Sequence, residues 1–206
     1  MDGGTRIRNI VFDVGGVLLR FDGRLFARPY VKDDTDAELL DAALFSSPFW
    51  LLLDAGAISE ETMERIAADT LPKRLRSALH ECFAGWHNRQ PVIAETNELA
   101  IRLHEKGYGC YILSNAGTRF SRLKDRIPSL PCMDGWVASA FERIMKPDPA
   151  IYLTLCERYG LRPEECLFVD DNIANVRGAE VAGMMGHLFV GADELECHLR
   201  ELGVEA

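Results

Sequence analysis

Three apolar runs in this sequence end in polar residues whose types suit the same chemistry. The runs are 10–12, 110–113 and 166–169, and they end at Asp13, at Ser114-Asn115 and at Asp170-Asp171. Apolar runs of this length are typical of buried parallel strands, because both faces of such a sheet are covered. Polar residues at the carboxyl ends of parallel strands lie where open α/β sheets bind their ligands. The three groups are therefore predicted to converge, together with Lys146, which precedes a predicted helix.

A set of residues of these types could transfer a phosphoryl group. Carboxylates from two strand ends would hold Mg²⁺, a hard cation that prefers oxygen ligands and retains waters. The cation and Lys146 would neutralise a phosphate, while Ser114 and nearby backbone N–H groups would hydrogen-bond its oxygens. Asp13 would then be free to attack phosphorus and form an aspartyl-phosphate. Taken singly, each residue also has a structural reading: Asp13 as a turn residue, Lys146 as a solvated loop lysine and Ser114 as a helix N-cap.

The elements that would position these residues alternate along most of the chain. The expected strands are 8–13, 110–113, 136–141, 166–169 and 187–190, and the expected helices in the same region are 92–106, 116–125, 150–159, 173–182 and 193–202. This alternation predicts an α/β fold with a Rossmann-like, doubly wound parallel sheet.

Between Phe21 and Gln90 the β-branched runs disappear and helical spacing takes over. Helices are expected over 36–45 and 59–70, and a third carries an apolar stripe from Leu75 to Trp86. We therefore expect a core of residues 1–20 and 91–206 and a helical cap of residues 21–90. Three aromatic residues of this insert would either form its core or line the substrate opening; they are Phe49, Trp50 and Trp86.

The composition of the chain limits the kinds of partner that we expect it to bind. The net charge of −9 makes general binding to nucleic acid or to an anionic membrane surface a poor expectation. Six cysteines without C-x-x-C spacing favour free thiols in a reducing cytoplasm. Residues 1–9 lack the apolar core of a signal peptide, and no run approaches the ~20 apolar residues of a membrane span. We expect a cytoplasmic protein, monomeric or weakly dimeric.

Four motifs in order resemble those of the haloacid dehalogenase-like (HAD) hydrolase superfamily. They are Asp13-Val14-Gly15-Gly16-Val17, Ser114-Asn115, Lys146-Pro147 and Asp170-Asp171-Asn172. The helical insert between the first two is similar in size to the cap of type 1 members. The glycine two positions after Asp13 is shared with the subgroup that contains a bacterial α-D-glucose-1-phosphate phosphatase. The resemblance covers essentially the whole chain and implies a Mg²⁺-dependent phosphatase acting on a small phosphorylated metabolite.

The resemblance also implies a role for each matching residue. Asp13 would be the nucleophile and a Mg²⁺ ligand, with Gly15 supplying a backbone carbonyl and Asp171 the second carboxylate. Asp170 and Asn175 would orient the lysine, the ligands or metal-bound water. In the same way, Ser114 and Asn115 would contact the transferring phosphoryl group, and Lys146 would stabilise the charge on it.

Gly15 departs from the pattern of most phosphatases of this superfamily, which carry an aspartate there as general acid and base. Glycine cannot transfer a proton, and general acid–base catalysis contributes ~10²–10⁴-fold. We therefore expect a preference for esters whose alcohol leaves easily, such as a sugar 1-phosphate. Asp22 could replace the missing acid, although a surface turn carboxylate is the simpler interpretation.

Two other functions stay open. A haloacid dehalogenase uses the same aspartate on carbon without Mg²⁺, but by resemblance it would carry a bulky aromatic residue at position 15 and no acidic pair at 170 and 171. A phosphoester-binding or regulatory protein, without catalysis because it lacks the acid, would bind a phosphoester but would not turn over p-nitrophenyl phosphate.

Overall fold

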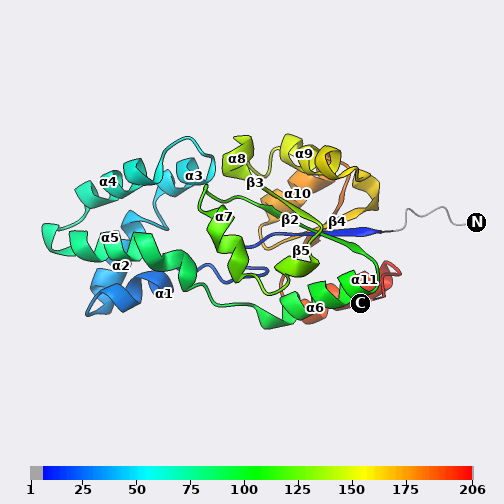
Figure 1. Cartoon of the computed structure of the whole chain (residues 1–206), viewed down its shortest axis with the longest axis horizontal. Helices are drawn as coiled ribbons and strands as arrows, with labels where there is room; N and C mark the ends of the chain where they lie inside the picture. Colours follow the sequence, from blue (N-terminus) through cyan, green and yellow to red (C-terminus); the bar gives the residue numbers. More distant parts are fainter. Residues whose placement is uncertain (1–6, 206) are drawn as a thin grey trace, which may run out of the picture.

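A five-stranded parallel sheet lies at the centre of the computed structural model, which describes residues 7–205 (Figure 1). Its strands are β1 (Asn9–Phe12), β2 (Gly109–Ser114), β3 (Gly135–Ala138), β4 (Cys166–Asp170) and β5 (Met185–Leu188). The spatial order is β3-β2-β1-β4-β5, and each neighbouring pair is parallel. The chain therefore winds outward in both directions from β1, which confirms the predicted doubly wound sheet. Residues 1–6 and 206, at the ends of the expected core, lie outside the described residues.

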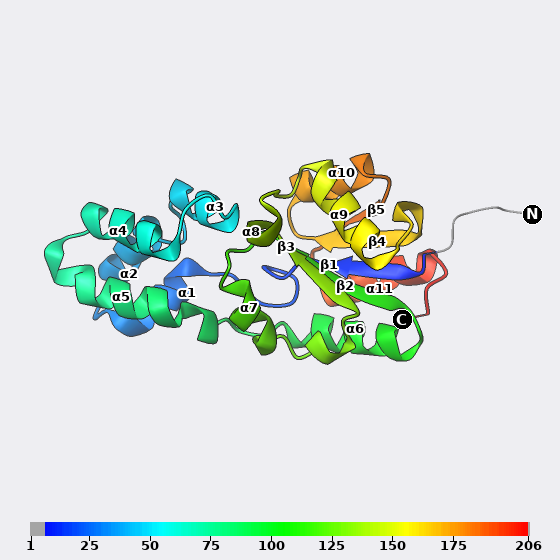
Figure 2. The ribbon, with the colours of Figure 1, turned by 45° about the horizontal axis from the view of Figure 1, so that its top comes forward.

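Helices cover both faces of the sheet. One face is covered by α6 (Ala94–Glu105) and α11 (Ala192–Glu201), and the other by α8 (Ser139–Glu142), α9 (Pro149–Tyr159) and α10 (Ile173–Val181) (Figures 1 and 2). Alternate residues of β1 enter separate apolar clusters on the two faces, with Ile10 and Phe12 on one and Val11 on the other. This two-sided burial explains why the strands are apolar throughout.

The insert contributes a separate group of helices. They are α1 (Gly23–Ala27), α2 (Asp34–Ala43), α3 (Pro48–Asp54), α4 (Glu60–Thr70) and α5 (Arg76–Gly85). They lie together beyond the end of the sheet toward which β1 runs, which is the edge that holds the strand-end motifs (Figures 1 and 2). Ser59 begins α4 as expected, because its hydroxyl accepts a hydrogen bond from the Thr62 backbone N–H at 3.1 Å.

The two connections between the sheet and the insert run side by side. The Arg20 backbone N–H donates to the Pro91 carbonyl at 2.8 Å, and the Ile93 backbone N–H donates to the Leu18 carbonyl at 3.0 Å. The chain thus enters and leaves the insert at one place, where Leu19 and Val92 form an antiparallel bridge.

Several elements differ from the sequence expectations for local reasons. The expected strand 136–141 stops at Ala138, and α8 begins at Ser139. The expected helix 116–125 is helical only from α7 (Phe120–Leu123), because the Ala116 carbonyl, which a helix would pair with the Phe120 N–H, accepts from the Ala140 backbone N–H at 3.3 Å instead. The last strand lies two residues before the expected 187–190. The short helices α1 and α3 were not expected, since five and seven residues are too few for a helical stripe.

Within residues 7–205, no helix combines the length and apolarity needed to cross a bilayer. The six cysteines are free thiols, as their spacing suggested.

Candidate active site

A buried lysine joins two of the strand-end carboxylates. Lys146 Nζ lies 2.7 Å from Asp13 Oδ1 after β1 and 2.7 Å from Asp170 Oδ2 at the end of β4. The same ammonium group donates to the Leu113 carbonyl on β2 at 3.1 Å. Because β1 lies between β2 and β4, this one side chain connects the ends of three adjacent strands.

Burial and the neighbouring charges together determine the pKa values of Lys146 and Asp13. Burial favours the neutral amine, but Asp13 and Asp170 outweigh it and hold the pKa of Lys146 above its ordinary value. Burial also raises the pKa of Asp13 to about 6, against the opposing charge of Lys146 and with a further contribution from Asp170. The charged lysine is therefore the group that keeps two carboxylates together in a region closed to solvent.

Asp170 is fully engaged in holding this arrangement. Asn175 Nδ2 lies 3.1 Å from each of its carboxylate oxygens, and the Asn172 backbone N–H donates to Oδ1 at 2.8 Å. The carbonyl of Asn175 in turn accepts from the Tyr152 hydroxyl at 2.6 Å. With no solvent exposure and no free oxygen, Asp170 orients Lys146 rather than facing a ligand.

Three carboxylates lie close enough to surround a cation. One oxygen from each of Asp13, Asp170 and Asp171 lies within 4.8 Å of the others, and Asp171 is solvent-exposed. Gly16 makes room for this cluster: its φ is +77°, and a Cβ there would lie 2.1 Å from Asp171 Oδ2. Since Asp170 is already engaged, Asp13 and Asp171 are the carboxylates that fit a hard, oxygen-preferring cation.

Ser114 and Asn115, at the end of β2, are used differently. The Asn115 side chain accepts from the Lys146 backbone N–H at 2.8 Å and donates to the Lys146 carbonyl at 2.9 Å. It therefore fixes the backbone of the lysine. Ser114 lines the cavity, and its hydroxyl takes part in no hydrogen bond within the described part of the chain. Ser114 is the member of this motif that remains available to a ligand.

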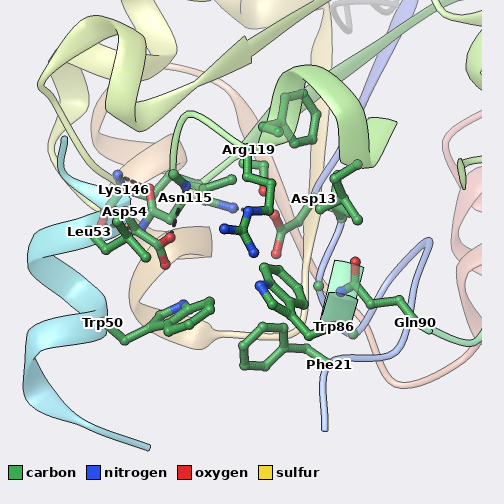
Figure 3. A pocket seen from close by; sticks show the side chains of 18 of the residues that line it. Asp13, Phe21, Trp50, Leu53, Asp54, Trp86, Gln90, Asn115, Arg119 and Lys146 are labelled. Atoms are coloured by element: carbon green, nitrogen blue, oxygen red, sulfur yellow. Dashed lines mark hydrogen bonds and ion pairs between the residues drawn. The ribbon is translucent and has the colours of Figure 1, made fainter. Parts of the chain in front are cut away.

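A cavity of about 340 Å³ lies between the sheet edge and the insert (Figure 3). Its floor carries Asp13, Lys146 and Asp171, and its opposite walls carry aromatic rings of the insert: Phe21, Trp50, Phe83 and Trp86. The ring centroids of Trp50 and Trp86 lie 5.3 Å apart, and that of Phe21 lies 5.8 Å from Trp50. Phe49, by contrast, is 39% exposed and does not line the cavity.

The cavity also contains residues that sequence reasoning did not single out. Arg119 spans from the loop before α7 to the insert, where its guanidinium hydrogen-bonds to the Glu60 carboxylate and the Phe83 carbonyl. Two buried polar atoms of the lining have no hydrogen-bond partner among residues 7–205: Gln90 Oε1, and Nε1 of Trp86, whose ring was already a candidate from the sequence. Neither Arg119 nor Gln90 follows an apolar strand, so the local sequence carries no signal for them.

Asp54, the last residue of α3, is a further carboxyl group in the cavity lining. Its Oδ1 accepts from the Gly117 backbone N–H at 2.9 Å. Burial raises the pKa of Asp54 to about 7, against hydrogen bonding from Gly117 and Trp50, and the charge of Asp13 adds to the rise. Asp22 has a different setting: it is exposed and caps α1 by accepting from the Leu25 backbone N–H at 3.0 Å.

Comparison with known proteins identifies the family. The model of the haloacid dehalogenase-like hydrolases matches residues 7–183, and the chain belongs to this family of hydrolases. Among curated relatives, the chloroplast flavin mononucleotide hydrolase 1 of Arabidopsis thaliana is 27% identical over 75% of this chain and 62% of its own length. The sesquiterpene phosphatase astK of Aspergillus oryzae is 27% identical over 88% of this chain and 89% of its own.

The family also includes enzymes with another reaction. The (S)-2-haloacid dehalogenase 4A of Burkholderia cepacia is 33% identical over 64% of this chain and 54% of its own length. Among solved structures, the HAD family enzyme bt-2542 of Bacteroides thetaiotaomicron, in complex with magnesium and inorganic phosphate, superposes with a TM-score of 0.67. It is 18% identical, over 88% of this chain and 93% of that one. The chain spans 62% and 54% of the length of the first and third relatives. Because the relatives are named for different reactions, membership in the family does not by itself select the reaction.

Proposed function

We propose that this protein is a Mg²⁺-dependent phosphatase that hydrolyses a small phosphorylated metabolite through an aspartyl-phosphate on Asp13. The observation that carries the proposal is the contact between Asp13 and Lys146 beside the free carboxylate of Asp171, at the floor of a cavity. A nucleophilic carboxylate, a fixed cation and an oxygen-rich metal position are the groups that phosphoryl transfer requires. The relative astK, which is named as a phosphatase, supports the same reading.

In this proposal the metal ligands are Asp13, Asp171 and the backbone carbonyl of Gly15. When bound, Mg²⁺ would supply positive charge to the phosphoryl oxygens and to the attacking carboxylate. The donor set supports this choice, since every group is an oxygen and Asp171 is left without an ion-pair partner among the described residues. Asp170 and Asn175 would hold Lys146 in place, as their hydrogen bonds indicate.

The chain's own residues would act in a fixed order. The Lys146 ammonium and the Ser114 hydroxyl would bind phosphoryl oxygens, with Asn115 contributing its backbone N–H, since its side chain is already used. Asp13 would attack phosphorus, and the bond from phosphorus to the alcohol oxygen would break. Water would then attack the aspartyl-phosphate, releasing phosphate and regenerating the Asp13 carboxylate.

The division into domains, the cellular location and the oligomeric state are also proposals. Residues 1–20 and 91–206 would form the catalytic core, and residues 21–90 would act as a cap that excludes water during attack. The paired linkers at Arg20 and Pro91 support this division. We keep the expectations of a cytoplasmic enzyme, monomeric or weakly dimeric, that binds neither nucleic acid nor membrane.

The size and lining of the cavity indicate which kind of substrate would fit. A volume of about 340 Å³ suits a small metabolite, and the rings of Phe21, Trp50 and Trp86 offer flat apolar surfaces. Trp86 Nε1 and Gln90 Oε1 offer one donor and one acceptor that have no partner within the described part of the chain. We propose a phosphoester whose alcohol has an apolar face and a few polar groups at its rim, a description that a sugar 1-phosphate meets.

The test is turnover of p-nitrophenyl phosphate and a panel of phosphorylated metabolites. We expect activity with Mg²⁺, its loss in EDTA, and its return when Mg²⁺ is added in excess. Asp13→Asn should lose turnover to background while remaining folded by circular dichroism. No turnover of p-nitrophenyl phosphate by the wild-type protein would support a binding or regulatory role and would contradict the proposal.

A haloacid dehalogenase is the second candidate, favoured by the similarity to the Burkholderia cepacia enzyme. Against it stand Gly15 in place of a bulky aromatic residue and the acidic pair Asp170-Asp171. Halide release from a 2-haloacid that persists in EDTA, without phosphatase activity, would establish this alternative.

A further inference from the structure

We propose that Asp54 supplies from the insert the general acid that Gly15 cannot supply from the sheet, which makes Asp54 a catalytic residue of the phosphatase proposed above. This inference rests on that proposed function and deepens it. Asp54 is nearly fully buried, at 9% exposure, and lines the same cavity as Asp13. Figure 3 shows both carboxyl groups pointing into this cavity, Asp54 from α3 and Asp13 from the end of β1.

The side from which Asp54 enters is the side on which an acid is needed. In phosphoryl transfer, the attacking and leaving oxygens lie roughly in line with phosphorus. Asp13 attacks from the sheet, so the leaving oxygen faces the insert. An acid on the insert can therefore reach the leaving oxygen without displacing the nucleophile.

The charges around Asp54 favour a protonated carboxyl group. The two cations in the cavity lining are already paired, Lys146 with Asp13 and Asp170, and Arg119 with Glu60. Asp54 itself has no ion-pair partner within the described residues, and the nearby charge of Asp13 is of the same sign. The consequence is a pKa of about 7, near the value that suits an acid catalyst working at neutral pH.

Packing does not explain the missing acid at Gly15. A Cβ at this position would meet only Phe21 Cβ at 3.7 Å, an ordinary contact, and its φ lies outside the left-handed region. A side chain would therefore fit at position 15. Asp22, the replacement considered from the sequence, is exposed and engaged in capping α1. Asp54 is held instead by the Gly117 backbone N–H, two residues after the phosphoryl-contacting motif.

With Asp54 as proton donor and acceptor, every proton in the reaction is accounted for. As Asp13 attacks phosphorus, the bond between phosphorus and the alcohol oxygen breaks, and that oxygen takes the proton from Asp54. The Asp54 carboxylate then accepts a proton from the water that attacks the aspartyl-phosphate. The bond from phosphorus to Asp13 breaks, phosphate leaves, and Asp54 is again protonated.

The experiment compares two esters of matched shape and different leaving groups. p-Nitrophenyl phosphate releases an acidic phenol that needs no proton, whereas p-nitrobenzyl phosphate releases a weakly acidic alcohol that does. The rate of the first phosphoryl transfer is measured in the pre-steady-state with Mg²⁺ for the wild-type protein, Asp54→Asn and Asp22→Asn. Asparagine keeps an oxygen for the Gly117 N–H, so the substitution removes the proton and retains the contact.

We expect Asp54→Asn to slow transfer from p-nitrobenzyl phosphate by ~10²–10⁴-fold and transfer from p-nitrophenyl phosphate by less than about fivefold. Asp22→Asn should match the wild type with both esters. An equal loss with both esters would show a structural role for Asp54, and no loss with the benzyl ester would show no role. Either result would overturn the inference while leaving the proposed phosphatase intact. No turnover of either ester by the wild type would overturn both.

A pH profile of the wild-type protein gives the same answer if Asp54→Asn fails to fold. With the benzyl ester, the first transfer should fall about tenfold for each pH unit above about 7, as Asp54 loses its proton. The phenyl ester serves as the internal control, because the other charged groups of the cavity lining affect both esters; these are Asp13, Asp171, Lys146, Arg119 and Glu60. Parallel profiles for the two esters would overturn the inference.

Discussion

The two walls of the cavity differ in the types of residue that they carry and in the elements that position them. At the sheet edge, Asp13 follows β1, and Ser114 and Asp170 end β2 and β4. Lys146, from the loop before α9, joins Asp13 and Asp170 in one buried ion cluster. On the insert, the groups that face the cavity come from several helices and from the segments that join the insert to the sheet, and half of them are aromatic rings. In the proposed mechanism, the sheet would hold the charges that act on phosphorus, and the insert would contact the remainder of the substrate.

The largest effect is expected where the sheet edge loses its cation. Lys146→Met leaves the carboxylates of Asp13 and Asp170 buried without a counter-charge, and we expect the free energy of unfolding to fall by about 3–5 kcal/mol. Turnover should be lost as well. Urea unfolding followed by circular dichroism measures the change. Lys124→Met, which removes a lysine paired with the exposed Asp125, should cost less than about 1 kcal/mol; equal losses would contradict the division.

On the insert, Asp54 should leave a signature in the pH dependence of stability. Its pKa rises from 3.8 to about 7 on folding, so its contribution is fully present below pH 4 and is lost as the pH rises through 7. Relative to Asp54→Asn, the wild type should therefore lose about 1.4 kcal/mol for each pH unit within this window, to a total on the order of 4 kcal/mol. Urea unfolding at pH 4, 5.5 and 7.5 tests this, and Asp22→Asn should show no such slope.

The contact between the two walls is the next target. Arg119→Lys keeps the charge but cannot reproduce the fork that reaches both Glu60 and the Phe83 carbonyl. We expect the KM for p-nitrophenyl phosphate to rise by the equivalent of about 1–2 kcal/mol, with a smaller change in kcat. Arg122→Lys on the neighbouring exposed face is the matched control. A change confined to kcat would place Arg119 with the sheet-edge machinery instead.

The smallest effect should come from a single hydrogen-bond donor. Trp86→Phe keeps an aromatic ring and removes the unpartnered indole N–H. For substrates with an acceptor on the alcohol, KM should rise about threefold to tenfold, the equivalent of about 1 kcal/mol, and kcat should change little. Substrates without such an acceptor should be unaffected. Steady-state kinetics over the metabolite panel measures this, and a uniform effect on every substrate would indicate lost packing.

The same contrast explains what could be predicted from the sequence. Asp13, Ser114, Lys146 and Asp170 stand next to strand or helix boundaries, and a parallel sheet brings such boundaries to one edge. The doubly wound topology was predicted for this reason. Trp50 and Trp86 were expected either to line the opening or to form the insert's core, and they do both, since each is 7% exposed.

Asp54 and Arg119 could not be found in this way, because their importance depends on contacts between distant segments. Asp54 meets the backbone of Gly117, 63 positions later, and Arg119 meets Glu60, 59 positions earlier. No periodicity or spacing encodes such a distance. The helix prediction for 116–125 failed in the same loop, since a distant residue, Ala140, donates to the Ala116 carbonyl that a helix would have used.

The paired linkers at Arg20 and Pro91 have a consequence for how such enzymes diversify. The insert leaves the sheet and returns to it at adjacent points. The attachment of its two ends therefore does not depend on the segment between them. A different module of any length could be spliced there without moving a catalytic strand. Under the proposed mechanism, exchanging the insert would change the contacts with the substrate and would also remove Asp54, the proposed proton donor.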